Sequence, residues 1–232
     1  GENLLSNFEK QTGCKVVMDL FDSNEQMYIK VANGEAYDIL IPSDYMIERL
    51  KQEKLIQPLD QDKITCLDDI NDAVKNLSYD PNNEYSVPYF WGSVGIVYDK
   101  TKVSKKDLKE EGFNIFLNQK YKGDIYLYDS ERDSFMMALK ALGYSMNTDN
   151  EKELADAYNW LLQSVQTMSP EIVTDEIIDN TAQARKALGI VYSGDAAYIM
   201  SENENIGFYM PNQGTNIWCD AMVIPQSSKN VD

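Results

Sequence analysis

Short apolar segments alternate with helix-like patterns along the whole chain, and this rhythm constrains the fold more than any other feature. Strand-like segments occupy residues 15–20, 38–41, 95–98, 125–128, 189–192, 206–210 and 221–224. Helix-like patterns occupy residues 4–12, 23–34, 44–50, 105–111, 135–142, 150–164, 175–188 and 195–201. Strands that are separated by helices predict an α/β fold with mainly parallel sheets.

Several of the expected helices carry recognisable end signals. Gly13 predicts the end of the first helix, because glycine readily adopts the left-handed conformation of a helix cap. Ser23, with Gln26 three residues later, fits a capping box. Asp44 is expected to cap the helix that follows it. These signals agree with the helix positions that the apolar pattern indicates.

Three of the strand-like segments run directly into polar residues and then into a helix. Residues 42–45 read Pro-Ser-Asp-Tyr, residues 129–133 read Asp-Ser-Glu-Arg-Asp, and residues 193–195 read Ser-Gly-Asp. In open α/β sheets, ligands bind outside the carboxyl ends of the strands. We therefore expect these three loops to face one cleft.

The charge balance narrows the choice of partner and of chemistry. The chain has 21 Lys and Arg residues against 38 Asp and Glu residues, no His, and a net charge of -17. Nucleic-acid binding through a basic face is disfavoured, whereas a cationic partner is favoured; acidity that only keeps the protein soluble is the alternative interpretation. Without His, Ser-His-Asp catalysis and His-ligated zinc are excluded.

The cysteines give no clear framework. Cys14, Cys66 and Cys219 are odd in number and widely spaced, so one pair could form a disulfide that the sequence does not identify. The simpler expectation is that all three are small, buried, apolar residues. The ten Met residues form no copper-site pattern, and the glycines form no phosphate-binding loop. No cofactor and no metal is expected.

Four segments, in this order, carry a family resemblance. They are 21–28 (F-D-S-N-E-Q-M-Y), 36–45 (A-Y-D-I-L-I-P-S-D-Y), 85–98 (Y-S-V-P-Y-F-W-G-S-V-G-I-V-Y) and 217–230 (I-W-C-D-A-M-V-I-P-Q-S-S-K-N). Together they resemble the spermidine/putrescine-binding proteins of bacterial polyamine ABC importers, which belong to the type II periplasmic-binding-protein family. The resemblance spans essentially the whole chain.

This resemblance implies a two-lobed α/β fold in which hinge strands join two mainly parallel sheets and the ligand is caught between the lobes. Lobe one is expected at residues 1–91 plus 211–232, and lobe two at residues 92–210. Family members begin with an earlier strand and continue with further helices. The sequence therefore suggests a fragment that is truncated at both ends, with an incomplete first lobe that is prone to strand swapping.

The resemblance also implies ligand-binding residues. In lobe one, Ser43 and Tyr45 match family contact positions, although Ser43 and Asp44 would also serve as a simple helix cap. Trp218 and Asp220 match the family's aromatic and carboxylate positions in the return segment. Being two residues apart, they face the same side of an extended chain.

Lobe two is expected to supply four further ligand contacts, namely Ser130, Asp133, Tyr192 and Asp195. Asp133 matches a family carboxylate at the start of a helix, where it would equally suit the helix dipole. Tyr192 stands where the family usually has Trp. Ser130 and Asp195 resemble the putrescine-preferring members and favour a diamine, although a helix cap is the alternative role for Asp195.

The predicted function is an extracytoplasmic receptor that captures putrescine or spermidine and delivers it to an ABC-transporter permease. The family implies a periplasmic or extracellular location, lipid anchoring to the outer face of the cytoplasmic membrane, and a monomer. The alternatives are a receptor for another small solute and, on a carboxylate pair such as Asp129 with Asp133, a hydrolase or lyase. The second alternative lacks both His and a nucleophile elbow.

Overall fold

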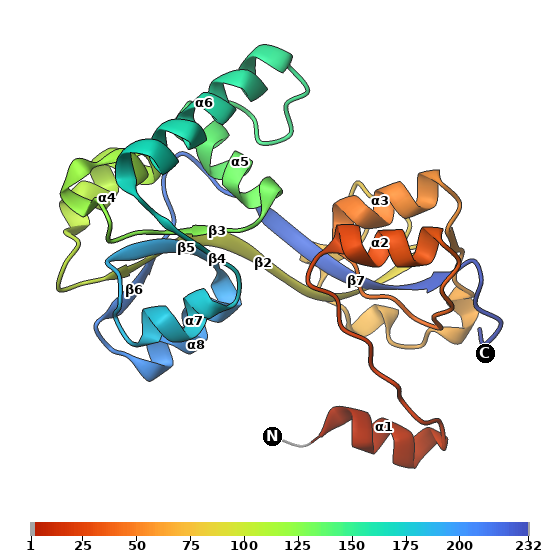
Figure 1. The fold of residues 1–232 in the computed structure, drawn as a ribbon. Coiled ribbons are helices and arrows are strands. Elements are labelled where there is room, and N and C mark those ends of the chain that lie inside the picture. Colours follow the sequence, from red (N-terminus) through yellow and green to blue (C-terminus); the bar gives the residue numbers. More distant parts are fainter. Residues whose placement is uncertain (1–2, 232) are drawn as a thin grey trace. The chain divides into compact units, whose positions relative to one another are not determined.

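The computed structural model describes residues 3–231. The chain forms two compact units, which are described separately (Figure 1). Unit 1 comprises residues 1–89 and 220–232, and unit 2 comprises residues 90–219. Two long strands, β2 (Ser86–Asp99) and β7 (Ile217–Pro225), each begin in one unit and end in the other. The chain therefore passes between the units through extended backbone.

Unit 2 contains two groups of paired strands, which a single parallel bridge links. Its strands are β2, β3 (Tyr126–Tyr128), β4 (Glu171–Val173), β5 (Leu188–Tyr192) and β6 (Ile206–Tyr209). Strands β5 and β6 both pair antiparallel with β2, so they run parallel to one another. Strands β3 and β4 pair in parallel, and a parallel bridge joins Ile125 to Leu188. Strands β3, β4, β5 and β6 therefore run in one direction, whereas the two ladders that they form with β2 are antiparallel.

Alternate residues of these strands are buried on opposite faces of the sheet. Ile96 and Ile190 belong to one apolar core, and the adjacent Val97 and Val191 belong to another. Helices α5 (Glu131–Ala141) and α6 (Glu151–Met168) cover the first face, while α7 (Glu176–Ala182) and α8 (Ser193–Glu202) cover the second (Figure 1). A sheet that is covered on both faces reads as continuous apolar strands, which explains the strand pattern in the sequence.

The remaining elements of unit 2 precede β3. They are α4 (Lys105–Glu111) and the 3-10 helices η4 (Gly112–Leu117) and η5 (Gln119–Tyr121). Residues 211–219, which the sequence placed with lobe one, are bonded to unit 2. The Gln213 side chain accepts from the backbone N–H of Phe113, and the Val94 N–H donates to the carbonyl of Asn216.

Unit 1 combines short helices with a short antiparallel strand pairing. Its helices are α1 (Leu4–Thr12), α2 (Asn24–Ala32) and α3 (Asp44–Gln52), with 3-10 turns η1 (Gln61–Lys63), η2 (Leu67–Asp69) and η3 (Asp72–Val74). Strand β1 (Ile56–Gln57) pairs antiparallel with β7, and single antiparallel bridges join Leu40 to Val223 and Ser43 to Asp220.

Two strand expectations in unit 1 are wrong. Residues 15–20 are extended but form no strand, and residues 38–41 make only the single bridge at Leu40. Val17 is 83% exposed and Leu20 is 78% exposed, so neither face of this segment is packed. An extended segment becomes a strand only where a neighbouring strand accepts its backbone hydrogen bonds. The expected mainly parallel sheet of lobe one is therefore absent from the described part of unit 1.

Two of the three predicted helix-end signals, Gly13 and Ser23, are confirmed. Gly13 ends α1 with a φ of 75°, and the Ser23 hydroxyl accepts from the Gln26 N–H at the start of α2. The cap of α3 is Ser43 and not Asp44, and the Ser43 side chain makes no capping bond. Helix α7 is shorter than the pattern 175–188 predicted, because the chain turns at Gln183 and Ala184 has a positive φ.

The expectation of three buried cysteines is also wrong, since Cys14 and Cys66 are exposed and only Cys219 is buried. Among the described residues no disulfide is formed. In the same part of the chain, no helix combines the length and the apolar character that a membrane crossing requires.

Candidate functional site

Asp133 is the centre of the polar cluster in unit 2. It lies in the first turn of α5 and is only 5% exposed. The Tyr192 hydroxyl donates to its Oδ2 at 2.7 Å, and the Ser130 hydroxyl donates to the same oxygen at 2.9 Å. The Asn216 carboxamide donates to Oδ1 at 3.3 Å. Three neutral donors, from three separate segments, therefore hold one buried carboxylate.

Ser130 also has a helix-capping role. It is the N-cap of α5, and its Oγ accepts from the Asp133 N–H at 3.4 Å. The Ser130 and Asp133 side chains thus contact each other at the end of the strand-to-helix loop 129–133. Local sequence is sufficient to build this part, because both residues belong to the same helix start.

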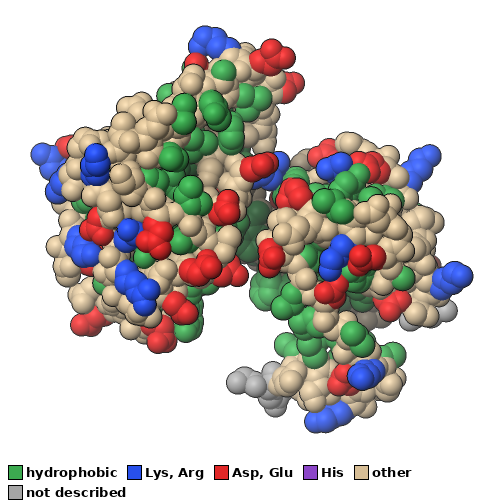
Figure 2. Space-filling view, viewed as in Figure 1, with side chains coloured by type: hydrophobic (Ala, Val, Ile, Leu, Met, Phe, Trp, Pro, Cys, Tyr) green, Lys and Arg blue, Asp and Glu red, His purple; other side chains and the backbone are tan. Residues whose placement is uncertain are grey.

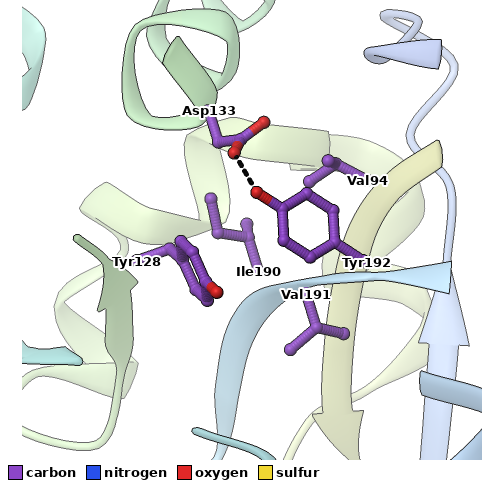
Figure 3. A pocket seen from close by; sticks show the side chains of 6 residues that line it. All are labelled: Val94, Tyr128, Asp133, Ile190, Val191 and Tyr192. Carbon is purple, nitrogen blue, oxygen red and sulfur yellow. Dashed lines mark hydrogen bonds between the residues drawn. The ribbon is translucent and has the colours of Figure 1, made fainter. Parts of the chain in front are cut away.

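A shallow hollow lies beside Asp133. Its lining combines one carboxylate, two tyrosines and three aliphatic side chains, namely Asp133, Tyr128, Tyr192, Val94, Ile190 and Val191. Figure 3 shows the Tyr192 hydroxyl directed at Asp133.

Three aromatic side chains form a continuous row through this cluster. The Tyr128 and Tyr192 rings pack edge to face with their centroids 5.5 Å apart. The Tyr192 and Trp218 rings pack in the same way with their centroids 5.6 Å apart. Gly92 makes room for this row, because a Cβ there would lie 2.7 Å from Cζ2 of Trp218. Aromatic faces of this kind attract cations and cover methylene groups.

Negative charge dominates the surroundings of this row. The Tyr128 hydroxyl donates to Asp175 Oδ1 at 3.2 Å, and burial together with Asp175 raises the pKa of Asp195. Burial, then Asp133, raises the pKa of Tyr192. No Lys or Arg of the described residues forms an ion pair with Asp133 or Asp195. Acidic side chains are also spread over the visible surface of each unit (Figure 2).

A second cluster lies in unit 1 and contains Ser43, Asp220 and Asn24. The Ser43 hydroxyl donates to Asp220 Oδ1 at 2.7 Å, across the single bridge between their backbones. The Asn24 side chain contacts Ser43 twice, at Oγ (3.1 Å) and at the backbone N–H (3.0 Å). Burial raises the pKa of Asp220, the Ser43 bond lowers it, and nearby Asp44 raises it.

Tyr45 lies near this second cluster in sequence, in the first turn of α3. It is partly buried, and its hydroxyl donates to Glu25 Oε1 at 2.9 Å. Glu25 follows Asn24 at the start of α2, so both side chains connect α2 with the start of α3. The loop 42–45 therefore contributes a hydroxyl and an aromatic ring at neighbouring positions.

The structure groups the eight predicted residues in two sets. Asp133, Ser130, Tyr192, Trp218 and Asp195 belong to unit 2, while Ser43, Tyr45 and Asp220 belong to unit 1. Along β7, Trp218 and Asp220 are partly exposed while Cys219 and Ala221 are buried, as period two requires. The ligand-binding role of the eight residues stays a prediction.

Sequence reasoning missed four polar contacts, those of Asn24, Tyr128, Asp175 and Asn216. Asn24 lies inside the segment 21–28 that carried the family resemblance, so that motif was its signal. Tyr128 ends a strand directly before a site loop, which is a second usable signal. Nothing in the sequence marks Asn216, because its partner Asp133 is 83 positions away.

No group of three or more Cys, Asp or Glu side chains in residues 3–231 is arranged to hold a metal ion. The two clusters consist of carboxylates, hydroxyls and aromatic rings. Their chemistry suits organic cations, because an ammonium group donates three hydrogen bonds to such acceptors.

Comparison with known proteins identifies the family of the chain. The family model for bacterial extracellular solute-binding proteins matches residues 3–232. The spermidine/putrescine-binding periplasmic protein of Escherichia coli K12 is 33% identical over 229 residues, which cover 98% of this chain and 65% of that protein. The putrescine-binding periplasmic protein SpuD of Pseudomonas aeruginosa is 31% identical over 248 residues, which cover 98% of this chain and 66% of that protein.

A solved structure agrees as well. The spermidine/putrescine ABC transporter substrate-binding protein PotD from Streptococcus pneumoniae is 38% identical, with a TM-score of 0.79, over 98% of this chain and 70% of that one. The chain thus spans 65% of the length of the Escherichia coli relative. This likeness confirms the predicted periplasmic-binding-protein fold, and the chain belongs to the bacterial extracellular solute-binding proteins.

Proposed function

We propose that this chain carries the ligand-capturing part of a receptor that binds a polyamine outside the cytoplasm and delivers it to an ABC-transporter permease. The observation that carries the proposal is the state of Asp133. This carboxylate is 5% exposed, accepts bonds from neutral donors, and has no Lys or Arg partner among the residues described. A buried carboxylate without a cation is suited to receive one from a ligand.

The chemistry of a polyamine matches what the two clusters offer. Each terminal ammonium requires hydrogen-bond acceptors, and each methylene gains ~0.8 kcal/mol on burial. An aromatic face adds ~0.5–2 kcal/mol for each cation that it contacts. The row Tyr128, Tyr192 and Trp218 supplies the faces, and Asp133 supplies the carboxylate.

Both units are proposed to contact the same ligand, as in hinge-closing receptors. Unit 2 would contribute Ser130, Asp133, Tyr192, Asp195 and Trp218, and unit 1 would contribute Ser43, Tyr45 and Asp220. Ser130 in place of a second carboxylate, together with the acidic Asp195, favours a diamine such as putrescine. No catalytic step is proposed, and the receptor acts by binding and release.

The names of the relatives support a periplasmic or extracellular location. We further propose lipid anchoring to the outer face of the cytoplasmic membrane and action as a monomer. Strand exchange between copies would begin at residues 15–20, where Val17, Met18 and Leu20 are exposed and unpaired. Leu20→Lys should then lower any dimer fraction seen by light scattering; an unchanged dimer would place the exchange elsewhere.

A thermal-shift titration of the complete gene product tests the proposed function. Putrescine, spermidine, cadaverine and lysine are each added while the unfolding midpoint is followed. A polyamine at about 100 times its Kd stabilises by ~2.7 kcal/mol, and lysine serves as the amino-acid comparison. Asp220→Asn should abolish most of the shift, whereas Asp179→Asn, which removes an exposed carboxylate from α7, should preserve it. No shift with any polyamine would refute the polyamine assignment.

A further inference from the structure

We propose that Asn24 is a positioning residue for ligand binding by Asp220, because it fixes the direction of the hydrogen bond that Ser43 gives to that carboxylate. This inference rests on the proposed function. It assigns a role to the segment 21–28, in which no predicted ligand contact lies. Asn24, Ser43 and Asp220 all belong to unit 1, so the contacts among them lie within one compact unit.

The Asn24 carboxamide holds Ser43 at two points. The Ser43 backbone N–H donates to Oδ1 at 3.0 Å, and Nδ2 donates to the Ser43 Oγ at 3.1 Å. A backbone N–H is only a donor, so the carboxamide oxygen must face it and the NH₂ group must face the hydroxyl. The orientation of the Asn24 side chain is therefore determined by its partners.

The bond from Asn24 determines what the Ser43 hydroxyl can do. A hydroxyl has one proton to donate and two lone pairs that accept. Because Nδ2 occupies a lone pair of Oγ, the hydroxyl proton is directed to the other near neighbour, Asp220 Oδ1, at 2.7 Å. The three side chains form a chain of donors with a single direction, from Asn24 through Ser43 to Asp220.

The ordinary roles of these residues do not account for the arrangement. Ser43 is the N-cap of α3 but makes no capping bond with its side chain. Ser23, and not Asn24, caps α2. The Asn24 side chain instead bridges 19 positions of sequence to reach Ser43. Neither helix start requires the contact that Asn24 makes.

The consequence for the ligand follows from the charge state of Asp220. Burial and the neighbouring Asp44 both raise the pKa of Asp220 and so disfavour its ionised form, whereas the hydrogen bond from Ser43 lowers this pKa and favours the ionised form. An ammonium ligand requires the ionised form. By directing the Ser43 O–H at Asp220 Oδ1, Asn24 favours the ionised form of this carboxylate, which is the form that binds a cation.

The substitution Asn24→Asp separates this mechanism from simple electrostatics. Aspartate keeps the size of Asn24 and can still accept from the Ser43 N–H, but it cannot donate to Oγ. The Ser43 proton is then shared between two carboxylates. Added negative charge by itself would tighten binding of a cation, whereas loss of the directed bond should weaken putrescine binding about tenfold, the order expected for a hydrogen bond to a charged group.

Calorimetric titration of putrescine and spermidine into the complete gene product measures this effect. A cycle with Ser43→Ala shows whether Asn24 acts through Ser43. In the Ser43→Ala background, Asn24→Asp should change the Kd less than about twofold or tighten binding. Asn33→Asp makes the same change at the other, exposed end of α2 and should not weaken binding.

A measurement without ligand keeps the inference separate from the proposed function. Carboxyl NMR titration of Asp220 should show that Asn24→Asp raises its pKa, and that this rise is smaller when Ser43 is Ala. Equal or tighter putrescine binding by Asn24→Asp, or an equal pKa rise in both backgrounds, overturns the inference. A wild-type protein that binds neither polyamine overturns the proposed function, and the NMR titration then decides the inference alone.

Discussion

The Tyr192 hydroxyl lies 2.7 Å from Asp133 Oδ2 and donates to it, although Tyr192 ends β5 and Asp133 lies in the first turn of α5, 59 positions earlier. The pair joins the aromatic row of unit 2 to its buried carboxylate. Its bond length is that of a charge-assisted hydrogen bond. Tyr192 therefore has two separable roles, one for its ring and one for its hydroxyl.

Replacing Tyr192 by Phe keeps the ring and removes the donor. We expect a loss of ~1–3 kcal/mol in the free energy of unfolding, because a buried carboxylate loses a hydrogen bond, and about tenfold weaker putrescine binding. Denaturant unfolding and calorimetry measure the two effects. Tyr158→Phe, on a side chain that is 57% exposed, is the control and should change neither. A Tyr192→Phe protein with the same free energy of unfolding as the wild type would mean that the Tyr192 hydroxyl does not stabilise the fold.

The Asp195 carboxylate should lower the free energy of unfolding and raise the affinity for putrescine. Burial and Asp175 raise its pKa above the ordinary Asp value. At pH values between the ordinary pKa of the unfolded chain and the raised pKa of the folded protein, the folded state binds more protons than the unfolded state. The free energy of unfolding therefore falls as pH rises through this range. Asp195→Asn should therefore stabilise the unliganded protein at neutral pH, by an amount that shrinks as pH falls towards the ordinary value near ~4.

The same substitution should weaken binding of putrescine, because one acceptor for its ammonium is lost. Unfolding midpoints at several pH values, with and without putrescine, give both results. Asp179 lies in α7 and is exposed, so Asp179→Asn should change neither the unfolding midpoint nor the affinity for putrescine. An Asp195→Asn protein that is less stable than wild type at neutral pH would contradict the assignment.

Asp107 should stabilise the folded protein at neutral pH, which is the opposite of the effect of Asp195. The Lys120 ammonium, 2.7 Å away, and the Tyr121 hydroxyl hold its pKa far below the usual range. A depressed pKa stabilises the folded state above the ordinary Asp value, and this contribution is lost as pH falls. Asp107→Asn should lower the unfolding midpoint at neutral pH and converge with wild type in acid. Glu110→Gln, whose partner Lys106 is 4.0 Å away, should have little effect.

Gly92 and Gly194 form a matched pair for testing how the Trp218 ring is held. A Cβ at Gly92 would lie 2.7 Å from the Trp218 ring and 2.8 Å from Ser193 Oγ, whereas a Cβ at Gly194 meets nothing within 4 Å. Gly92→Ala should destabilise by ~1–3 kcal/mol through overpacking. Gly194→Ala, inside α8, should be neutral or stabilise by up to ~1 kcal/mol. Denaturant midpoints compare them, and equal effects would show that the Trp218 ring yields easily.

Periodicity predicted much of unit 2 correctly. The segments 125–128, 189–192 and 206–210 correspond to strands that are buried on both faces, so their apolar runs were unambiguous. The segment 15–20 has the same kind of composition, yet it is not a strand. Strand formation depends on a partner that supplies backbone hydrogen bonds, and a local pattern carries no information about that partner.

The amino-acid sequence by itself determined the α/β rhythm and the caps at Gly13 and Ser23, because these depend on residues within a few positions of each other. Only the tertiary structure decided which donors reach the carboxylates. Asn216 lies 83 positions from Asp133, and Ser43 lies 177 positions from Asp220. Such bonds form only after the sheets and helices have packed, since packing brings the two side chains within reach.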